Sequence, residues 1–444
     1  MTPPTGPFAA IDDARDRIAR EHPRWHAAHL IAAMLFGFSY GLGITPLEVG
    51  GIPLMLVTVL RFGQTRRLYA ALLREPVVLA LLAFVAWALL ALSWSLNRSH
   101  GLDEIGSVRW LWVFVAIWPI ADRRLPVIAA LAAGMFTLHG SQVGQLIGQR
   151  YGIPELTWGQ FPDRIAGWGG PVVTGSLLSG VFGLHAAAAV LGRGRVAWIA
   201  RALTLVTGVA LIATGTRGAW LAAMALLGTL GLVAVITHRR SIGVRQVLIA
   251  AGVAAVVAAT AWFTIGDAIT SRISDGWKEV RDAFESEDYY SSTGGRIIMW
   301  YWAWEAVKAE PVTGVGTGGY RAWVNERQTE RGIDPATQRV LDHAHGSAVH
   351  VAAVQGLIGL TLFATLCILV LRRSWVPPTL VTRGEAHPYD LGLFFGVLGL
   401  LLAGVLDSVH INAQSSALLA LLTALSLGLA RRRPATRAGR SPLA

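Results

Sequence analysis

Stretches of about 20 apolar residues, long enough to cross the hydrocarbon layer of a membrane as a helix, recur along almost the whole chain. In lipid the backbone must satisfy its own hydrogen bonds, so spanning segments are helices or closed barrels. Barrel strands alternate apolar and polar residues, and this sequence lacks that alternation. Hydrophobic residues make up 53% of the chain and charged residues only 15%. The sequence therefore predicts an all-α integral membrane protein.

We predict twelve transmembrane helices. They lie near residues 27–43, 46–62, 76–94, 107–121, 125–147, 171–192, 197–213, 217–237, 246–266, 347–371, 390–407 and 412–430. The predicted organisation has four parts: a cytoplasmic segment with nine spans, one large loop, three further spans and a basic tail. These parts are residues 1–266, 267–346, 347–430 and 431–444.

Basic residues fix the expected orientation, because Lys and Arg accumulate in short cytoplasmic loops. With the N-terminus inside, the inward segments carry 24 of the 38 Lys and Arg residues. Nine of the others lie between Arg272 and Arg339, in a loop long enough to translocate regardless of its charge. Both termini are therefore expected in the cytoplasm. The net charge of +11 needs no nucleic acid, since basic inward loops face anionic lipid.

The outward connections are short except for residues 148–170 and the large loop, 267–346. A loop of about 80 residues is longer than a connector requires, which marks it as functional. Its pattern predicts a charged helix over residues 275–287. A second helix is expected to start at Arg296, after a Gly-Gly pair, and to stop before Pro311.

Arg217 lies in a Thr-Gly-Thr-Arg-Gly turn where one span returns directly into the next. One interpretation is an arginine that reaches lipid phosphate at the headgroup level. The other is an anion clamp, because guanidinium binds phosphate through two hydrogen bonds and Thr216 adds a hydroxyl donor nearby.

Arg296 is expected at the N-terminus of the second loop helix, where free N–H groups and the helix dipole already favour an anion. A positive side chain is unfavourable there unless an anion offsets it, which favours ligand binding. The alternative is an ion pair with Glu287 or Asp288, a few residues earlier.

Three histidines, His343, His345 and His350, lie where the chain returns to the membrane. Each could be an ordinary interfacial residue or a catalytic base. Asp342, His343 and His345 also resemble part of a metal site. A His-x-His pair suits a metal only in an extended segment, and no partner motif occurs on the outward side, so no metal is expected.

The order of these motifs resembles that of a known family. Gly-Arg-x-x-x-Trp begins at Gly295, a Gly-Val-Gly-Thr-Gly-Gly-Tyr run ends at Tyr320, and His345 precedes a Gln-Gly-Leu-Ile-Gly run that starts at Gln355. Together with the arginine turn at 214–218, this order is similar to the O-antigen ligase and polymerase superfamily of bacterial envelope enzymes. That family often has an acidic residue where Gln355 stands, which leaves open what supports His345.

The resemblance implies a GT-C-like membrane fold in the bacterial inner membrane, with the active site on the periplasmic face. The implied reaction is an inverting glycosyl transfer, without cofactor or metal, from an undecaprenyl diphosphate-linked O-antigen donor to a sugar hydroxyl of the lipid A-core acceptor. Membrane lipids surround both substrates.

The resemblance also implies roles for individual residues. Diphosphate is a good leaving group, so the enzyme needs cations where charge develops, and Arg217 and Arg296 suit that task. A sugar hydroxyl must lose its proton as it attacks, and His345 is the expected base, although His343 is not excluded. Thr216, His343 and Tyr320 are expected to contact the diphosphate or the sugar.

Three alternatives remain open. An O-antigen polymerase would use a second lipid-linked glycan as acceptor, and a protein O-oligosaccharyltransferase would use a protein. A lipid-linked glycan flippase should carry charged residues inside several spans, whereas the spans here are nearly free of charge. The single dominant loop favours the ligase.

Overall fold

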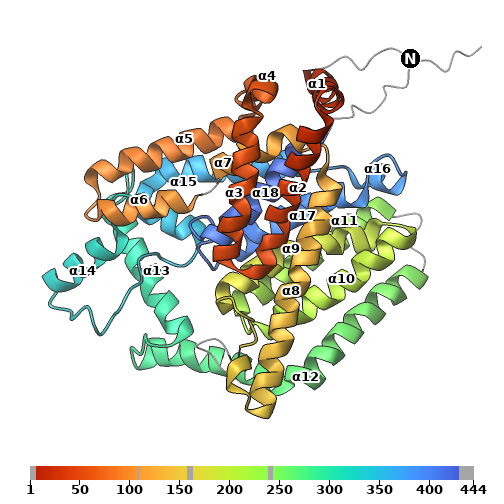
Figure 1. Cartoon of the computed structure of the whole chain (residues 1–444). Helices are drawn as coiled ribbons and strands as arrows, with labels where there is room; N and C mark the ends of the chain where they lie inside the picture. The colour runs from red at the N-terminus through yellow and green to blue at the C-terminus, as the bar shows by residue number, and fades with distance from the viewer. Residues whose placement is uncertain (1–6, 109, 158–163, 239–243, 430–444) are drawn as a thin grey trace, which may run out of the picture.

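The computed structural model describes residues 7–108, 110–157, 164–238 and 244–429. Within these ranges the chain is helical and contains no strand (Figure 1). The first nine α-helices are α1 (Pro7–Glu21), α2 (Pro23–Ser39), α3 (Ile44–Leu60), α4 (Phe62–Leu72), α5 (Pro76–Ala91), α6 (Arg98–Ser107), α7 (Trp110–Ile117), α8 (Arg124–Tyr151) and α9 (Pro171–Leu191). The other nine are α10 (Gly194–Ala213), α11 (Arg217–His238), α12 (Val244–Glu285), α13 (Ser292–Ala309), α14 (Tyr320–Glu330), α15 (Ser347–Ser374), α16 (Pro378–Thr382), α17 (Pro388–Ala403) and α18 (Ala413–Leu427).

Six helices of the described chain are long and apolar enough to cross a membrane, which makes this a multi-pass membrane protein. They are Pro76–Trp94, Arg124–Tyr151, Pro171–Leu191, Gly194–Ala213, Arg217–Thr237 and Ser347–Thr382. Each of the twelve predicted spans overlaps a helix, but several of these helices are short. A helix of 16 residues, such as α17, is about 24 Å long. Twelve crossings therefore stay a prediction, and the predicted tail 431–444 lies outside the described residues.

The large loop differs from its prediction in two places. The charged helix expected at 275–287 is not separate, because α12 runs without a break for 42 residues and includes it. The second helix, α13, starts at Ser292 with Ser291 as its N-cap. Arg296 is therefore one turn inside the helix and not at its N-terminus, because the Ser-Ser-Thr segment before the glycines already caps and begins it.

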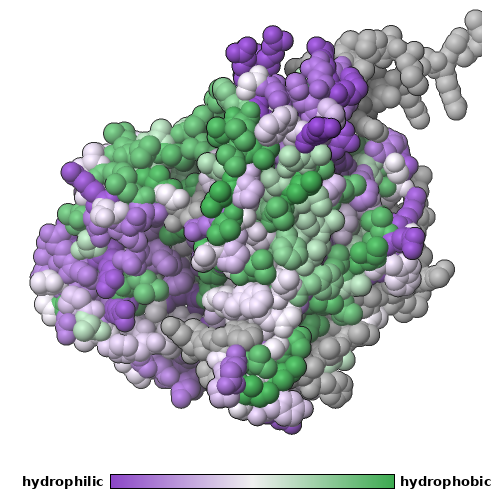
Figure 2. All heavy atoms as spheres, viewed as in Figure 1, coloured by the Kyte–Doolittle hydropathy of each residue, from purple (hydrophilic) through white to green (hydrophobic). Residues whose placement is uncertain are grey.

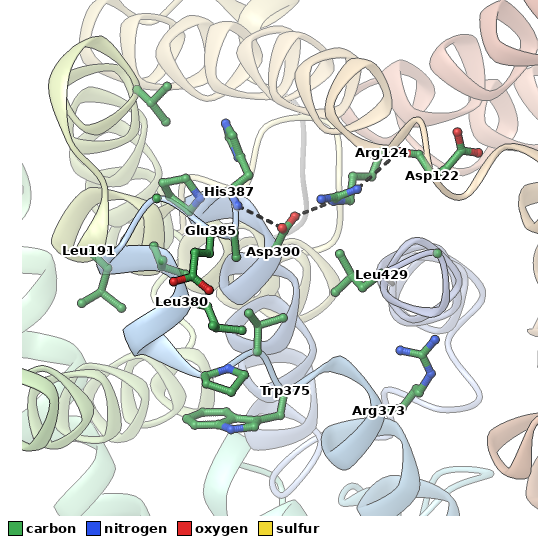
Figure 3. A pocket seen from close by; sticks show the side chains of 18 of the residues that line it. Asp122, Arg124, Leu191, Arg373, Trp375, Leu380, Glu385, His387, Asp390 and Leu429 are labelled. Carbon is green, nitrogen blue, oxygen red and sulfur yellow. Dashed lines mark hydrogen bonds and ion pairs between the residues drawn. The ribbon is translucent and has the colours of Figure 1, made fainter. Parts of the chain in front are cut away.

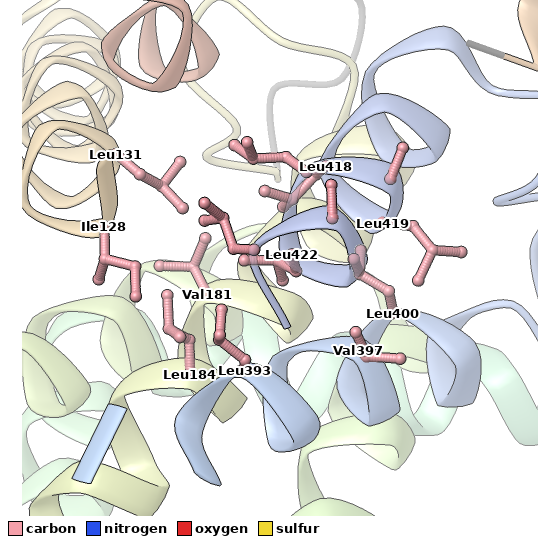
Figure 4. Close-up of a cluster of buried hydrophobic side chains, with 14 of the residues drawn as sticks. Ile128, Leu131, Val181, Leu184, Leu393, Val397, Leu400, Leu418, Leu419 and Leu422 are labelled. Carbon is pink, nitrogen blue, oxygen red and sulfur yellow. The ribbon is translucent and has the colours of Figure 1, made fainter. Parts of the chain in front are cut away.

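The hydrophobic core lies between α8, α9, α17 and α18, where leucine and valine side chains from all four helices meet (Figure 4). Glycine lets the backbones of α9 and α17 approach closely. A Cβ atom on Gly183 would lie 2.2 Å from the carbonyl oxygen of Phe395, and one on Gly399 would lie 2.3 Å from that of Ser179. Small residues at such contacts are typical of helices that pack inside a membrane.

Hydrophilic residues gather at two places on the surface (Figure 2). One covers α1 and α4, at the top of the view, and the other covers α13 and α14, at the left. Hydrophobic surface lies between them, as expected of a protein in a bilayer. The loop has a small core of its own, in which α13 and α14 pack through Trp302, Tyr320 and Val324. The loop is thus a folded part of the protein.

Candidate functional site

Four arginines from separate segments lie close together on the predicted outward side. Arg217 begins α11, Arg272 belongs to α12, Arg296 to α13, and Arg164 precedes α9. Burial, followed by the positive charges of the other three, lowers the pKa of Arg164 to about 10. Such mutual repulsion marks a site where an anion would be stabilised.

Arg217 is held by the large loop. Its Nη1 and Nη2 atoms lie 2.8 and 3.1 Å from the two carboxylate oxygens of Glu279. Nη1 also donates to Thr293 Oγ1 at 2.7 Å, and Nε donates to the carbonyl oxygen of Arg272 at 2.8 Å. A Cβ on Gly276 would lie 3.2 Å from Arg217 Cζ, so a larger residue at this position of α12 would crowd the guanidinium. The side chain therefore ties α11 to α12 and α13, which neither sequence interpretation anticipated.

Glu279 completes this contact. Burial raises the pKa of its carboxyl, but the hydrogen bonds and charge of Arg217 and the bonds from Thr293 outweigh burial and lower it to about 2. The carboxylate is therefore ionised throughout the physiological range. It neutralises part of the positive charge of the four arginines and leaves an excess.

Thr216 positions a second arginine. Its hydroxyl donates to the carbonyl oxygen of Pro171 at 2.8 Å and accepts from Arg164 Nη2 at 2.8 Å. Arg164 Nε also donates to the carbonyl oxygen of Thr214. Gly215 has a φ of 61°, and a Cβ there would lie 3.2 Å from Arg164 Cγ. The Thr-Gly-Thr turn thus fits around the Arg164 side chain.

Arg296 has an unused donor. Its Nη1 donates to the carbonyl oxygen and the hydroxyl of Ser292, one turn earlier, each at 3.0 Å. Its Nε is buried and has no hydrogen-bond partner within the described ranges. Within the described residues, Arg296 forms no ion pair with Glu287 or Asp288. Burial, partly offset by the negative charge of Asp407, lowers the pKa of Arg296.

His345 faces a carboxylate. Its Nδ1 lies 3.6 Å from Asp407 Oδ1, in the segment between α17 and α18. This is an electrostatic contact, since Nδ1 makes no hydrogen bond within the described ranges. Asp407 accepts hydrogen bonds from Ser176 Oγ at 3.0 Å and from the Ser408 backbone N–H at 2.8 Å. A carboxylate beside Nδ1 orients the ring and leaves Nε2 to accept a proton. Asp407 is therefore the partner for which the sequence offered no candidate, and Gln355 instead accepts a bond from Trp87 through its backbone.

The backbone at His345 is unusual, with a φ of 42° in a residue that is not glycine. Trp300 Nε1 donates a hydrogen bond to the carbonyl oxygen of His345. Trp300 and Arg296 are four residues apart on α13 and so share one face of that helix. One turn of α13, carrying the Gly-Arg-x-x-x-Trp motif, therefore positions Arg296 and also binds the backbone of His345 through Trp300. Strained backbone of this kind is often found at functional sites.

The two remaining predicted residues are His343, which is half-buried, and Tyr320. Burial, followed by repulsion from His345 and His350, lowers the pKa of His343 to about 4, so it is neutral at pH 7. Its ring lies against that of His345, with centroids 4.7 Å apart. Tyr320 is fully buried, and its hydroxyl donates to the carbonyl oxygen of Met299 at 2.5 Å. Tyr320 therefore packs inside the loop and is remote from solvent.

The structure thus brings Arg217, Arg296 and His345 to one region and adds residues that the sequence analysis did not select. These are Arg164, Arg272, Glu279 and Asp407. Asp407 had been assigned to the end of the eleventh span, whereas α17 stops at Ala403. Asp407 could have been selected from the sequence because it is a charged residue at the outward end of a predicted span.

Residues 202–364 match a family model described as O-Antigen ligase. The matched segment contains Arg217, Arg272, Arg296 and His345, whereas Arg164 and Asp407 lie outside it. No curated protein matches the chain.

Proposed function

Since the chain belongs to the O-antigen ligase superfamily, we propose that it transfers a polysaccharide from undecaprenyl diphosphate to a sugar hydroxyl of lipid A-core. The observation that carries this proposal is the convergence of four arginines beside the His345–Asp407 pair. Cations suited to a diphosphate and a base suited to a hydroxyl then lie at one site.

The arginines are proposed to bind the diphosphate of the donor. Arg296 supports this role because its buried Nε–H has no hydrogen-bond partner within the described ranges. Arg217 contributes positive charge and, because Glu279 and Thr293 fix it, also holds the loop in place. Arg164 and Arg272 add positive charge near both, and Thr216 positions Arg164.

His345 is proposed to act as the base. Asp407 orients Nδ1, so Nε2 can take the proton of the acceptor hydroxyl. His343 is a weaker candidate, since its lowered pKa makes it a poorer base at neutral pH. We propose that it packs against His345 and contacts the sugar.

The proposed reaction is one in-line displacement. The acceptor oxygen attacks the anomeric carbon, the bond from that carbon to the diphosphate oxygen breaks, and the diphosphate leaves with the electron pair. His345 receives the hydroxyl proton. A single displacement inverts the anomeric centre, and guanidinium groups take the place of the divalent cation that often holds a diphosphate.

The proposal includes the membrane arrangement. We propose twelve crossings in a GT-C-like fold, both termini in the cytoplasm of a bacterium, and the large loop, 267–346, on the periplasmic side of the inner membrane. The segments that bear the candidate residues all fall on the outward side of the charge-based topology. Both lipid-linked substrates would then reach the site along the membrane surface.

Reconstitution in proteoliposomes tests the function. The purified protein is supplied with undecaprenyl diphosphate glycan and lipid A-core, and the products are separated by mass. We expect glycan joined to lipid A-core, with inverted linkage and with EDTA present. A lengthened lipid-linked glycan would indicate a polymerase, a glycosylated acceptor protein an oligosaccharyltransferase, and glycan that crosses the bilayer without a new bond a flippase. Any of these three results in place of the ligated product would contradict the proposal.

A further inference from the structure

A pocket of about 930 Å³, drawn in Figure 3, has a wall that does not include His345 or the four clustered arginines. Its walls come from the C-terminal ends of α9, α15 and α18 and the N-terminal ends of α8 and α17. The helix α9 extends from Pro171, beside Thr216, to Leu191 in the pocket wall. A helix of 21 residues is about 30 Å long, so the pocket lies about one membrane thickness from the candidate site.

Several charges in the pocket wall are paired with a neighbour. Arg124 forms an ion pair with Asp390, which also caps α17. Asp12 pairs with Arg15, and Asp122 pairs with Arg123. These four acidic and basic wall residues therefore leave little charge for a ligand.

Arg373 also has partners, since it donates to the carbonyl oxygens of Ser426 and Leu427 at the end of α18. Two other arginines of the wall, Arg193 and Arg372, are exposed. Neither makes a hydrogen bond or ion pair with any residue whose position is described. Glu385 also lines the wall and has a partner of its own. The pocket therefore offers two exposed guanidinium groups to an anion, beside one carboxylate that is already engaged.

The same pocket has an apolar side. Leu191, Val196, Leu380 and Leu429 line it, together with Trp375, which is 40% exposed. Tryptophan at the rim of an apolar surface is typical of the membrane–water boundary. A soluble anion would gain nothing from these side chains, whereas the acyl chains of a lipid would cover them.

We propose that this pocket binds an anionic phospholipid of the cytoplasmic leaflet. Arg193 and Arg372 bind the headgroup phosphate, and the acyl chains lie against Trp375 and the leucines beside it. Basic pockets between membrane helices on the cytoplasmic side bind anionic headgroups in this way. The inference rests on the proposed membrane arrangement but not on the proposed transfer reaction, because the pocket lies about one membrane thickness from the candidate site.

Native mass spectrometry of the detergent-solubilised protein, titrated with phosphatidylglycerol and with phosphatidylcholine, tests this inference. We expect tighter binding of phosphatidylglycerol. Each arginine near a charged headgroup contributes about fivefold in affinity, so Arg193→Gln/Arg372→Gln should weaken phosphatidylglycerol binding by about 25-fold. The matched control is Arg66→Gln/Arg67→Gln, which removes two exposed arginines of α4, outside the pocket wall, and should change binding less than twofold.

An equal loss of phosphatidylglycerol affinity in the two double variants would overturn the proposal. It would indicate that the lipid is attracted by the positive charge of the cytoplasmic side in general and not by this pocket. A third arm uses glycerol phosphate, which carries the phosphate without acyl chains. If glycerol phosphate raised the melting temperature as much as phosphatidylglycerol does, the pocket would be a site for a soluble phosphate and the lipid assignment would be wrong. The single variants Arg193→Gln and Arg372→Gln, each expected to lose about fivefold, repeat the test with a smaller perturbation.

Discussion

Arginines gather at both ends of the molecule. At the pocket end, Arg124 pairs with Asp390, and Arg15 donates two hydrogen bonds to the carbonyl oxygen of Trp118 and stacks on its ring. These contacts tie one helix to another. At the outward end, four arginines meet near two carboxylates, Glu279 and Asp407, and repel one another. The paired arginines at the pocket end stabilise the fold, and of the arginines there only Arg193 and Arg372 lack a pair within the described pocket wall. At the outward end the four arginines converge on one another and leave positive charge for a ligand.

The largest expected effect separates the two neighbouring histidines of the outward end. His345→Ala should lower kcat by about 10²- to 10⁴-fold, the usual contribution of a general base. His343→Ala should lower it less than tenfold, because the pKa of His343 is already depressed by burial. Transfer rates of the two purified variants, measured with saturating donor, check this.

A kcat that fell equally in both variants would contradict the assignment of His345. Asp407→Asn sharpens the same comparison. It should lower kcat by about tenfold, because Asp407 acts through His345, and should not raise the KM of the donor, because the change removes a negative charge near Arg296. The melting temperature of each variant monitors folding.

Arg296→Gln should weaken donor binding by about 10- to 100-fold, since a charged hydrogen bond contributes about 1.5–3 kcal/mol. Arg281→Gln is the matched control, because Arg281 is exposed on α12 in the same loop. Its loss should change donor affinity less than twofold. Titration with a labelled undecaprenyl diphosphate analogue measures both, and equal affinities would place Arg296 among the structural arginines.

Glu279→Gln should lower stability at neutral pH by about 1–3 kcal/mol, because it breaks the contact between Arg217 and the loop. The folded pKa of Glu279, about 2, lies below its ordinary value of 4.5. The stabilisation is therefore complete above about pH 4.5 and is lost as the pH falls towards 2.

Melting temperatures of the wild type and Glu279→Gln, recorded across this pH range, check the prediction. The difference between the two proteins should shrink on acidification. A difference that stayed constant with pH would mean that the carboxylate of Glu279 does not stabilise the fold through its charge.

The smallest effect is expected at the pocket end. Asp390→Asn should lower the melting temperature by a few degrees, since it weakens the pair with Arg124 and the cap of α17. The transfer rate at saturating substrate should stay within twofold of the wild type. A large loss of kcat in a folded protein would show that the two ends are coupled.

The membrane class and the principal segments of this protein were predictable because apolar length is a local signal. Every predicted span overlaps a helix, and Arg217, Arg296 and His345 came from short motifs. The pairing of His345 with Asp407 joins positions 62 residues apart, and the contact of Arg217 with Glu279 also spans 62 residues. Only packing decides such contacts, so neither pairing could be predicted from the motifs.

The start of α13 was misplaced for a local reason. A Gly-Gly pair favours an end or a turn, but Ser291 caps the helix and both glycines fall in its first turn. The continuity of α12 was missed because its charged end differs in composition from its apolar part, although both parts have helical periodicity.

Because α12 is one continuous helix, it joins the segment expected in the membrane to the segment that contacts Arg217. The 42 residues of α12 give it a length of about 63 Å along its axis, roughly twice the thickness of the hydrocarbon layer. Arg272, Gly276 and Glu279 lie on the arm outside the predicted span, so Glu279 is about 20 Å beyond its outer end. A tilt of the helix by about 10° would displace that arm by about 3 Å at Glu279. Because helices tilt to match bilayer thickness, the contact between Glu279 and Arg217 is the part of the candidate site that α12 links directly to the surrounding membrane.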